Sequence, residues 1–188
     1  MKRAKPKKKS IYVKQVDPKV KHYIVRNSNY VAMSLVIRTL WEKNGWRRIR
    51  IDRFVESYMV LIEEVADRRS NPWKSVDEAS EIIGIDIVEL LNELFGWHIN
   101  RRAQKKAETP IEVVKLANYV AISIAVRTLW DLYGFREKRI SRFIHDYADM
   151  VNVYGDKEGQ TMKCITDTQK LTGVEVVKLL NEVYGWRN

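Results

Sequence analysis

The sequence contains one segment twice, and this repeat limits what the chain can fold into. The tetrapeptide Asn-Tyr-Val-Ala at residues 29–32 returns at residues 118–121, and the correspondence continues without a gap from residues 29–97 to residues 118–186. Of the 69 aligned pairs, 26 are identical, and most other apolar positions exchange one apolar residue for another. Two similar copies of about 70 residues indicate two structural units. Because a unit of that size buries only a modest core, we expect the two units to pack against each other.

Helical periodicity dominates both copies and predicts an all-α fold, a tandem duplication of a four-helix unit with a disordered basic N-terminal arm. The first predicted helices, residues 30–43 and 109–132, are apolar around most of their circumference, which is typical of a central buried helix. Second helices are predicted at residues 48–66 and 137–153, because apolar residues recur there at spacings of three and four. No segment has a convincing strand pattern.

Capping residues and glycines mark the ends of the predicted helices. Thr109 and Glu112 have the spacing of a capping box at the start of the first helix of the second copy, and Ser75 and Glu78 have it at a third helix. Asp86 is predicted to cap the fourth helix. Glycine adopts a left-handed backbone without a Cβ penalty, so glycines are expected to end the helices. These are Gly45, Gly84, Gly96, Gly134, Gly173 and Gly185.

The positive charge is concentrated at the N-terminus. Residues 1–26 carry 10 basic and 1 acidic side chains, a net charge of +9, whereas residues 27–97 carry 9 and 12, a net charge of −3. Residues 98–117 carry 5 and 2 (+3), and residues 118–188 carry 10 and 9 (+1). We therefore divide the chain into a basic arm, repeat 1, a basic connection that merges into the first helix of repeat 2, and repeat 2. The arm lacks apolar periodicity and is expected to be disordered without a partner.

Lysine-rich segments bind the phosphate backbone of nucleic acids by releasing counterions, so the arm favours nucleic acid, DNA or RNA, or a nucleoprotein complex as the partner. A tail that only increases solubility is the alternative. The residues predicted to contact phosphate are Lys2, Arg3, Lys5, Lys7, Lys8, Lys9 and Lys14 in the arm and Arg101, Arg102, Lys105 and Lys106 in the connection.

Arginines spaced three residues apart open the second predicted helix of each repeat. Residues at this spacing lie near one face of a helix, so each set forms a ridge that can hold phosphates by point contacts. The ridge residues are Arg47, Arg50 and Arg53 in repeat 1 and Arg136, Arg139 and Arg142 in repeat 2. The alternative is that they pair with nearby carboxylates such as Asp52, Glu56, Glu137 or Asp146. Arg38 and Arg127 lie on nearly apolar helices and are expected to satisfy acidic partners or helix-end carbonyls.

Aromatic residues next to the glycine turns are expected to be core residues, because they occupy matched positions in the two copies. They are Trp41, Trp46, Trp97, Trp130 and Trp186, with Phe135 in place of one tryptophan. Trp73 lies outside this pattern, after a proline in a predicted loop, and is predicted to be an exposed protein contact. The third and fourth helices have the outline of a helix-turn-helix. Their turn-proximal positions carry acidic and apolar residues instead of base-reading side chains, so helix packing is the preferred interpretation.

Nothing in the sequence predicts an enzyme. The three histidines are scattered, and no cluster of His, Cys or carboxylates has metal-ligand spacing, so neither a metal nor a cofactor is expected. Cys164, the single cysteine, occupies the position of Ser75 in the other copy and is expected to replace it as a helix cap; a lone cysteine indicates a reducing compartment. No apolar run approaches the roughly 18 residues of a membrane span, so a cytoplasmic protein without a membrane partner is expected.

One pattern in both repeats resembles small uncharacterised helical proteins from phages and mobile elements of Firmicute bacteria. It comprises Leu40-Trp41, Gly45-Trp46, Arg50-Ile51 and Arg53-Phe54, with the second copy Leu129-Trp130, Gly134-Phe135, Arg139-Ile140 and Arg142-Phe143. Those proteins typically carry one such unit, with a Gly-Phe turn before a helix that begins with spaced basic residues. Here Arg47 and Arg136 stand where a second glycine is usual, and the basic arm also departs from the pattern. The resemblance implies a mobile-element setting in a bacterial host, where small non-enzymatic proteins regulate transcription, handle nucleic acid or block host defence.

The sequence therefore predicts a non-enzymatic binding protein whose basic arm engages nucleic acid, with the arginine ridges as secondary contacts. One alternative is a protein-directed inhibitor of a host nucleoprotein machine, such as an anti-CRISPR or another anti-defence protein. Another is a structural homodimer, because the very apolar first helices can continue across a two-fold axis.

Overall fold

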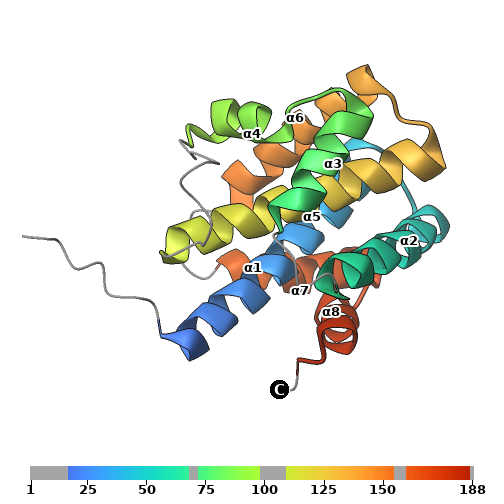
Figure 1. Cartoon of the computed structure of the whole chain (residues 1–188). Coiled ribbons are helices and arrows are strands. Elements are labelled where there is room, and N and C mark those ends of the chain that lie inside the picture. The colour runs from blue at the N-terminus through green and yellow to red at the C-terminus, as the bar shows by residue number, and fades with distance from the viewer. Residues whose placement is uncertain (1–16, 68–71, 98–108, 155–159, 187–188) are drawn as a thin grey trace, which may run out of the picture.

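The computed structural model describes residues 17–67, 72–97, 109–154 and 160–186, and within these ranges it is entirely helical (Figure 1). The elements are α1 (Pro18–Arg38), the π-helical segment η1 (Thr39–Lys43), α2 (Arg48–Asp67), α3 (Trp73–Ile83), α4 (Ile87–Phe95), α5 (Pro110–Tyr133), α6 (Glu137–Tyr154), α7 (Gln160–Thr172) and α8 (Val176–Tyr184). The predicted all-α class is confirmed. Each repeat contributes four α-helices at matched positions along the described chain.

The first helix of each repeat lies at the centre of the molecule, and the two pack against each other. Leu35, Val36 and Ile37 of α1 and Ala125 and Val126 of α5 are each at most 1% exposed. A helix that is apolar on nearly all sides must be covered on all sides, and here the two such helices cover one another. The apolar faces that motivated the homodimer prediction are thus buried within a single chain.

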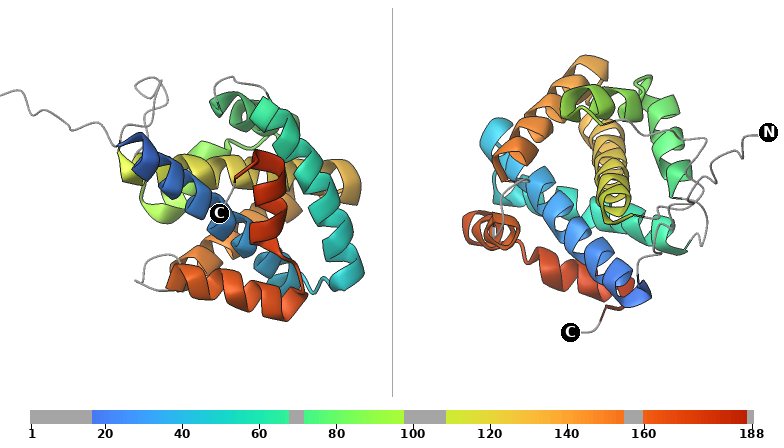
Figure 2. Two further views of the ribbon diagram at one scale, coloured as in Figure 1. Left: turned by 90° about the horizontal axis from the view of Figure 1, so that it is seen from below. Right: turned by 90° about the vertical axis from the view of Figure 1, so that its left-hand side faces the viewer.

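The third and fourth helices of each repeat pack on the other repeat. Helix α3 covers α5, and α7 covers α1, as Figure 2 shows; α4 packs against α6, and α8 against α2. The buried residues of both repeats consequently form one hydrophobic cluster. The expectation that the repeats pack together is confirmed. In this contact the third and fourth helices of each repeat pack on the first and second helices of the other.

Matched hydrogen bonds connect the two repeats in both directions. The Tyr30 hydroxyl donates to Oδ1 of Asn181 at 2.5 Å, and the Tyr119 hydroxyl donates to Oδ1 of Asn92 at 2.7 Å. Tyr30 corresponds to Tyr119 in the repeat alignment, and Asn92 corresponds to Asn181. Reciprocal contacts of this kind are the mark of a two-fold relation, so the repeats are arranged like the subunits of an isologous dimer.

Helix α1 begins well before its predicted start at residue 30. Asp17 caps it by accepting a hydrogen bond from the Lys19 backbone N–H at 2.8 Å, and Pro18 occupies the first helical position. The predicted boundary of the arm at residue 26 therefore falls inside α1. The early turns were missed because residues 18–29 are half-buried or exposed and lack a continuous apolar stripe.

Helices α2 and α6 begin at residues 48 and 137, as predicted, and of the predicted caps at Thr109, Asp86 and Ser75, two are right and one is wrong. Thr109 and Glu112 form the expected capping box at α5, and Asp86 caps α4 by accepting from two backbone N–H groups. Ser75 caps nothing, because α3 already begins at Trp73; its hydroxyl instead donates to the Pro72 carbonyl at 2.8 Å.

Helix α5 is long and apolar enough to cross a membrane by length and composition, which the sequence prediction overlooked. However, 72% of its most apolar window is buried among the other helices. The core helix of a globular protein has the same composition, and the position of α5 at the centre of the fold accounts for it.

Candidate nucleic-acid interface

Each arginine ridge begins where a central helix turns into the next helix. The turn after η1 passes through Gly45 with φ 67°, and the turn after α5 passes through Gly134 with φ 61°. Residues with a side chain reach this left-handed region only at an energetic cost, so glycine suits both turns. We call residues 45–53 the first corner and residues 134–142 the second corner.

One arginine closes each corner. Nη1 of Arg47 donates to the carbonyl oxygens of Trp41 (3.4 Å) and Trp46 (3.1 Å), and the guanidinium carbon lies 5.3 Å from the Trp41 ring centroid. Arg136 makes the equivalent bonds and lies 4.5 Å from the Trp130 ring centroid. Carbonyls at a helix C-terminus carry partial negative charge, so a cation stabilises each turn. These two arginines have a structural role and remain exposed.

The two corners touch through aromatic residues. The rings of Trp46 and Phe135 meet edge to face at 6.2 Å, and Tyr133 packs on Trp46 at 4.6 Å. Arg50 lies over Trp46 at 5.3 Å, and Arg139 lies over Phe135 at 3.8 Å. Taken in turn, separations of 5.3, 6.2 and 3.8 Å place the two guanidinium carbons at most about 15 Å apart. The fold therefore brings Arg50 and Arg139 of the two ridges, which are far apart in the sequence, near each other in space.

The outer arginines of both ridges keep their charges available. Arg50, Arg53, Arg139 and Arg142 are exposed, and their side chains form no ion pair or hydrogen bond with any other residue in the described part of the chain. The alternative that the ridge arginines pair with Asp52, Glu56, Glu137 or Asp146 does not hold for these four arginines within the described residues, and Asp52 pairs with Arg48 instead.

Arg48 belongs to neither ridge and is held by two partners. Its Nε lies 2.8 Å from the Asp52 carboxylate, and its Nη1 donates to the Thr172 carbonyl at 2.9 Å. This bond ties the first corner to the end of α7 in the other repeat. Arg48 therefore stabilises the position of the corner, while Arg50 and Arg53 face solvent.

Arg38 and Arg127 are structural, as predicted. Arg38 lies within 2.5 Å of the Glu42 carboxylate and 4.3 Å from the Tyr154 ring centroid, and it is 8% exposed. Arg127 approaches Glu78 at 3.9 Å and Asp131 at 3.7 Å. Both arginines pair with carboxylates, so we leave them out of the candidate interface.

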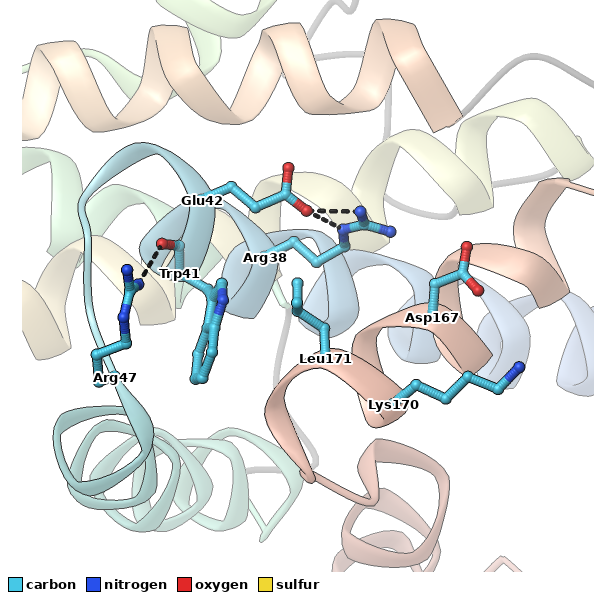
Figure 3. Close-up of a pocket in the computed structure, with 7 residues that line it drawn as sticks. All are labelled: Arg38, Trp41, Glu42, Arg47, Asp167, Lys170 and Leu171. Carbon is cyan, nitrogen blue, oxygen red and sulfur yellow. Dashed lines mark hydrogen bonds and ion pairs between the residues drawn. The ribbon is translucent and has the colours of Figure 1, made fainter.

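A shallow depression adjoins Arg38 between η1 and α7 (Figure 3). The Arg38–Glu42 ion pair and the Arg47–Trp41 hydrogen bond line one side, while Asp167 and Lys170 project from α7 on the other. Cations and carboxylates alternate here, so the depression has no strong preference for an anion. The joined corners are the better anion site.

The predicted phosphate contacts in the arm (residues 2–14) and in the connection (residues 101–106) lie outside the described residues. Within the described chain, the ridges are the part of the predicted interface that the structure brings together. Ile49 lies in the first corner and Tyr133 adjoins it, and neither was predicted as a site residue. The sequence does carry a signal for both residues, because each differs in type from its counterpart in the other repeat, Asn44 for Tyr133 and Lys138 for Ile49.

Two single-residue predictions were wrong. Trp73 is 7% exposed and packs on Tyr119 at 5.5 Å, so it is a core residue and not an exposed contact. Pro72 precedes α3 directly, and the docking of α3 on α5 buries the indole. Cys164 is fully buried inside α7 and caps no helix. Its burial raises the pKa of the thiol, which disfavours the reactive thiolate.

The helix-packing interpretation of the third and fourth helices is confirmed. Ile87, Val88 and Leu91 of α4 are at most 3% exposed, and Val176 and Leu180 of α8 are at most 2% exposed. A reading helix would present these positions to the groove of DNA. Here they form part of the core.

In the described part of the chain, no group of three or more His, Cys, Asp or Glu side chains is placed to hold a metal ion. No protein-family model, curated protein or solved structure matches this chain.

Proposed function

We propose that the protein is a non-enzymatic nucleic-acid-binding protein that holds backbone phosphates on its joined corners. The observation that carries this proposal is the contact between Trp46 and Phe135, with Arg50 and Arg139 stacked on the two rings. Both guanidinium groups are exposed and lack carboxylate partners among the described residues.

The chemistry of these groups suits phosphate. A guanidinium is planar, stays charged at all relevant pH values and offers two parallel N–H donors to phosphate oxygens. The guanidinium carbons of Arg50 and Arg139 lie 5.3 and 3.8 Å from aromatic ring centroids, and these ring contacts leave the N–H groups without a carboxylate partner among the described residues. Contacts to the backbone give affinity without sequence information, so we expect binding that depends little on base sequence and strongly on salt.

The basic arm adds to the same activity. Its net charge of +9 over residues 1–26 exceeds that of either repeat. Lysines in such a segment neutralise further phosphates and steepen the dependence of affinity on salt. The resemblance to phage and mobile-element proteins agrees with handling of nucleic acid in a bacterial cytoplasm.

Fluorescence anisotropy with labelled DNA and RNA, across a salt series, tests the proposal. The test variant is Arg50→Glu combined with Arg139→Glu in the full chain. The matched control is Lys163→Glu combined with Lys178→Glu, which changes the net charge equally at exposed positions outside the corners. At about 0.1 M salt the screening length is about 10 Å, so distant charges contribute little.

We expect the corner variant to weaken binding at least about tenfold and to reduce the salt slope by about 1.4, since each phosphate contact to a single strand contributes about 0.7. The control should stay within about twofold of the wild type. Equal losses in both variants would show that only net charge matters and would overturn the corner as the interface. Absence of binding to any nucleic acid at low salt would overturn the whole proposal and direct attention to a protein target.

A further inference from the structure

An open pocket lies at the first corner, beside the arginine ridge. Its volume is about 650 Å³, within the range of about 300–1,000 Å³ typical of small-ligand sites. The residues that matter here are Trp46, Ile49 and Tyr133 on the apolar side and Arg47, Arg50 and Arg53 on the charged side. None of the described residues that line it carries a carboxylate. The pocket thus combines an apolar wall with cations. These two features match the base and the negatively charged phosphate of a nucleotide.

The apolar wall is rigid. Trp46 is 3% exposed and is packed between Phe54, Phe135 and Tyr133. The Tyr133 hydroxyl donates to the Arg50 carbonyl at 3.3 Å, which ties the end of α5 to the first turn of α2. Burial raises the pKa of Tyr133, so the phenol stays neutral and keeps this bond even though Arg50 and Arg53 favour its ionised form. Ile49, by contrast, is 73% exposed and has no structural need to be apolar.

The equivalent position at the second corner cannot form such a pocket. Asn44 is the counterpart of Tyr133 in the repeat alignment. Its side-chain amide donates to the Thr39 carbonyl at 3.2 Å, within its own turn. Lys138 replaces Ile49, and together with Glu137 it faces acidic residues of α4 across a separate groove. The apolar surface is therefore particular to the first corner.

We propose that this pocket receives the base of an unpaired nucleotide, while Arg50 and Arg53 hold the adjoining phosphates. This inference rests on the proposed function and specifies its substrate as single-stranded nucleic acid. A base inside a duplex stays stacked on its neighbours and cannot enter, whereas a base of a single strand turns out at little cost. Aromatic and apolar contact with a base depends little on its identity, so the pocket selects unpaired strands without reading sequence.

The test separates base binding from phosphate binding by comparing two strands with the same phosphates. One probe is a thymidine strand of about 12 nucleotides, and the other is an abasic strand of equal length. The full chain is compared with Ile49→Lys, which copies the second corner at an exposed position and adds a positive charge. A second variant, Tyr133→Asn, copies Asn44, with Tyr133→Phe as its rescue and Leu132→Asn as a control at a neighbouring exposed position.

We expect the wild type to bind the thymidine strand about tenfold more tightly than the abasic strand, the effect of one stacked base. Ile49→Lys and Tyr133→Asn should reduce this ratio toward one without weakening abasic binding, and Tyr133→Phe and Leu132→Asn should preserve it. A purely electrostatic site would respond to Ile49→Lys by binding both strands more tightly and equally, which would overturn the inference.

Two further outcomes are distinguishable. Equal binding of both strands by the wild type, lost in Arg50→Glu with Arg139→Glu, would overturn the base pocket and leave the phosphate interface standing. Absence of salt-dependent binding to either strand would overturn the proposed function and the pocket together. Tyr133→Asn is interpreted only alongside a thermal melt, and Ile49→Lys gives the same answer without disturbing the core.

Discussion

The two corners share three matched arginines and have the same net charge, yet they present different surfaces. Residues 47–53 and residues 136–142 each contain four basic side chains and one acidic side chain. At both corners a left-handed glycine is followed by an arginine that caps the turn and another that stacks on an aromatic ring. The first corner adds a pocket with an apolar side, whereas Glu137 and Lys138 of the second corner adjoin an acidic groove on α4.

The difference separates the residues that build the turn from those that give one copy its own surface. Residues that both copies share build the turn and hold charge at a fixed place, which suits the phosphate contacts that we propose. Residues that differ, above all Ile49 and Tyr133 against Lys138 and Asn44, determine what else can be held there. Since the two corners share one scaffold, each provides a natural control for the other.

The largest effect is expected from the aromatic contact that joins the corners. Trp46→Ala removes a side chain that is 3% exposed and touches Phe135 and Tyr133. We expect a loss of about 3–5 kcal/mol in the free energy of unfolding, measured by chemical denaturation. Trp41→Ala, at a half-buried position of the same turn, is the control and should cost markedly less. Similar losses for both variants would mean that the corners are not joined through Trp46.

Single charge reversals should distinguish the corners in binding. Arg50→Glu affects both a proposed phosphate contact and the pocket wall, whereas Arg139→Glu affects a proposed phosphate contact alone. On a single strand that carries bases, we expect losses of about tenfold and about threefold, respectively. Anisotropy titrations at one salt concentration measure both values. A larger loss for Arg139→Glu would reverse the assignment of the corners.

The last turn of each repeat offers a comparison of pH dependence. Tyr184 stacks on Trp186 at 4.3 Å, and its counterpart Phe95 stacks on Trp97 at 4.5 Å. Burial raises the pKa of Tyr184 to about 12 from its ordinary value of 10.0. The folded chain therefore retains a proton that the unfolded chain loses between about pH 10 and pH 12, so stability falls as pH rises through this window.

Tyr184→Phe, which copies the first repeat, should remove its part of this alkaline loss and leave stability at neutral pH nearly unchanged. Denaturant unfolding at pH 8 and near pH 11 is expected to give a smaller difference for the variant than for the wild type. Tyr23→Phe, at a position 60% exposed, is the control. An alkaline loss unchanged by Tyr184→Phe would show that other groups account for it.

The smallest effect is expected from copying the pocket residue into the second corner. Asn44→Tyr supplies a ring there but loses the hydrogen bond from the Asn44 amide to Thr39. Because Lys138 still occupies the place of Ile49, we expect a gain of no more than about twofold in affinity for a base-carrying strand. A gain as large as the loss caused by Tyr133→Asn would mean that the ring alone makes the pocket.

Local signals in the sequence predicted the helices well. Asp86, Thr109 and the turn glycines mark helix ends through caps that need only neighbouring residues. The start of α1 and the start of α3 were missed because Asp17 and Pro72 precede turns with little apolar periodicity. The exchange of α3 and α7 between repeats could not be predicted, since the same apolar stripe can cover the central helix of either repeat.

The candidate site shows the same contrast between local signals, which the sequence carries, and tertiary contacts, which it does not. The arginine spacing and the repeat indicated both ridges, and their exposure agrees with that prediction. The contact between Trp46 and Phe135, which joins the ridges, depends on how the two central helices cross, and no local pattern encodes that crossing. Tyr133 reaches the first corner from the other repeat for the same reason. The burial of Trp73 likewise follows from docking of α3 on α5.

Photo-crosslinking tests most directly whether the joined corners hold a single strand. A strand carrying 5-iodouracil is irradiated with the full chain, and mass spectrometry locates the adducts. Because this base forms bonds with aromatic side chains that it contacts, we predict adducts at Tyr133 or within residues 46–53 that disappear in Arg50→Glu with Arg139→Glu. Adducts found only outside the corners, for example on α4 or α8, would contradict the assignment of the interface to these turns.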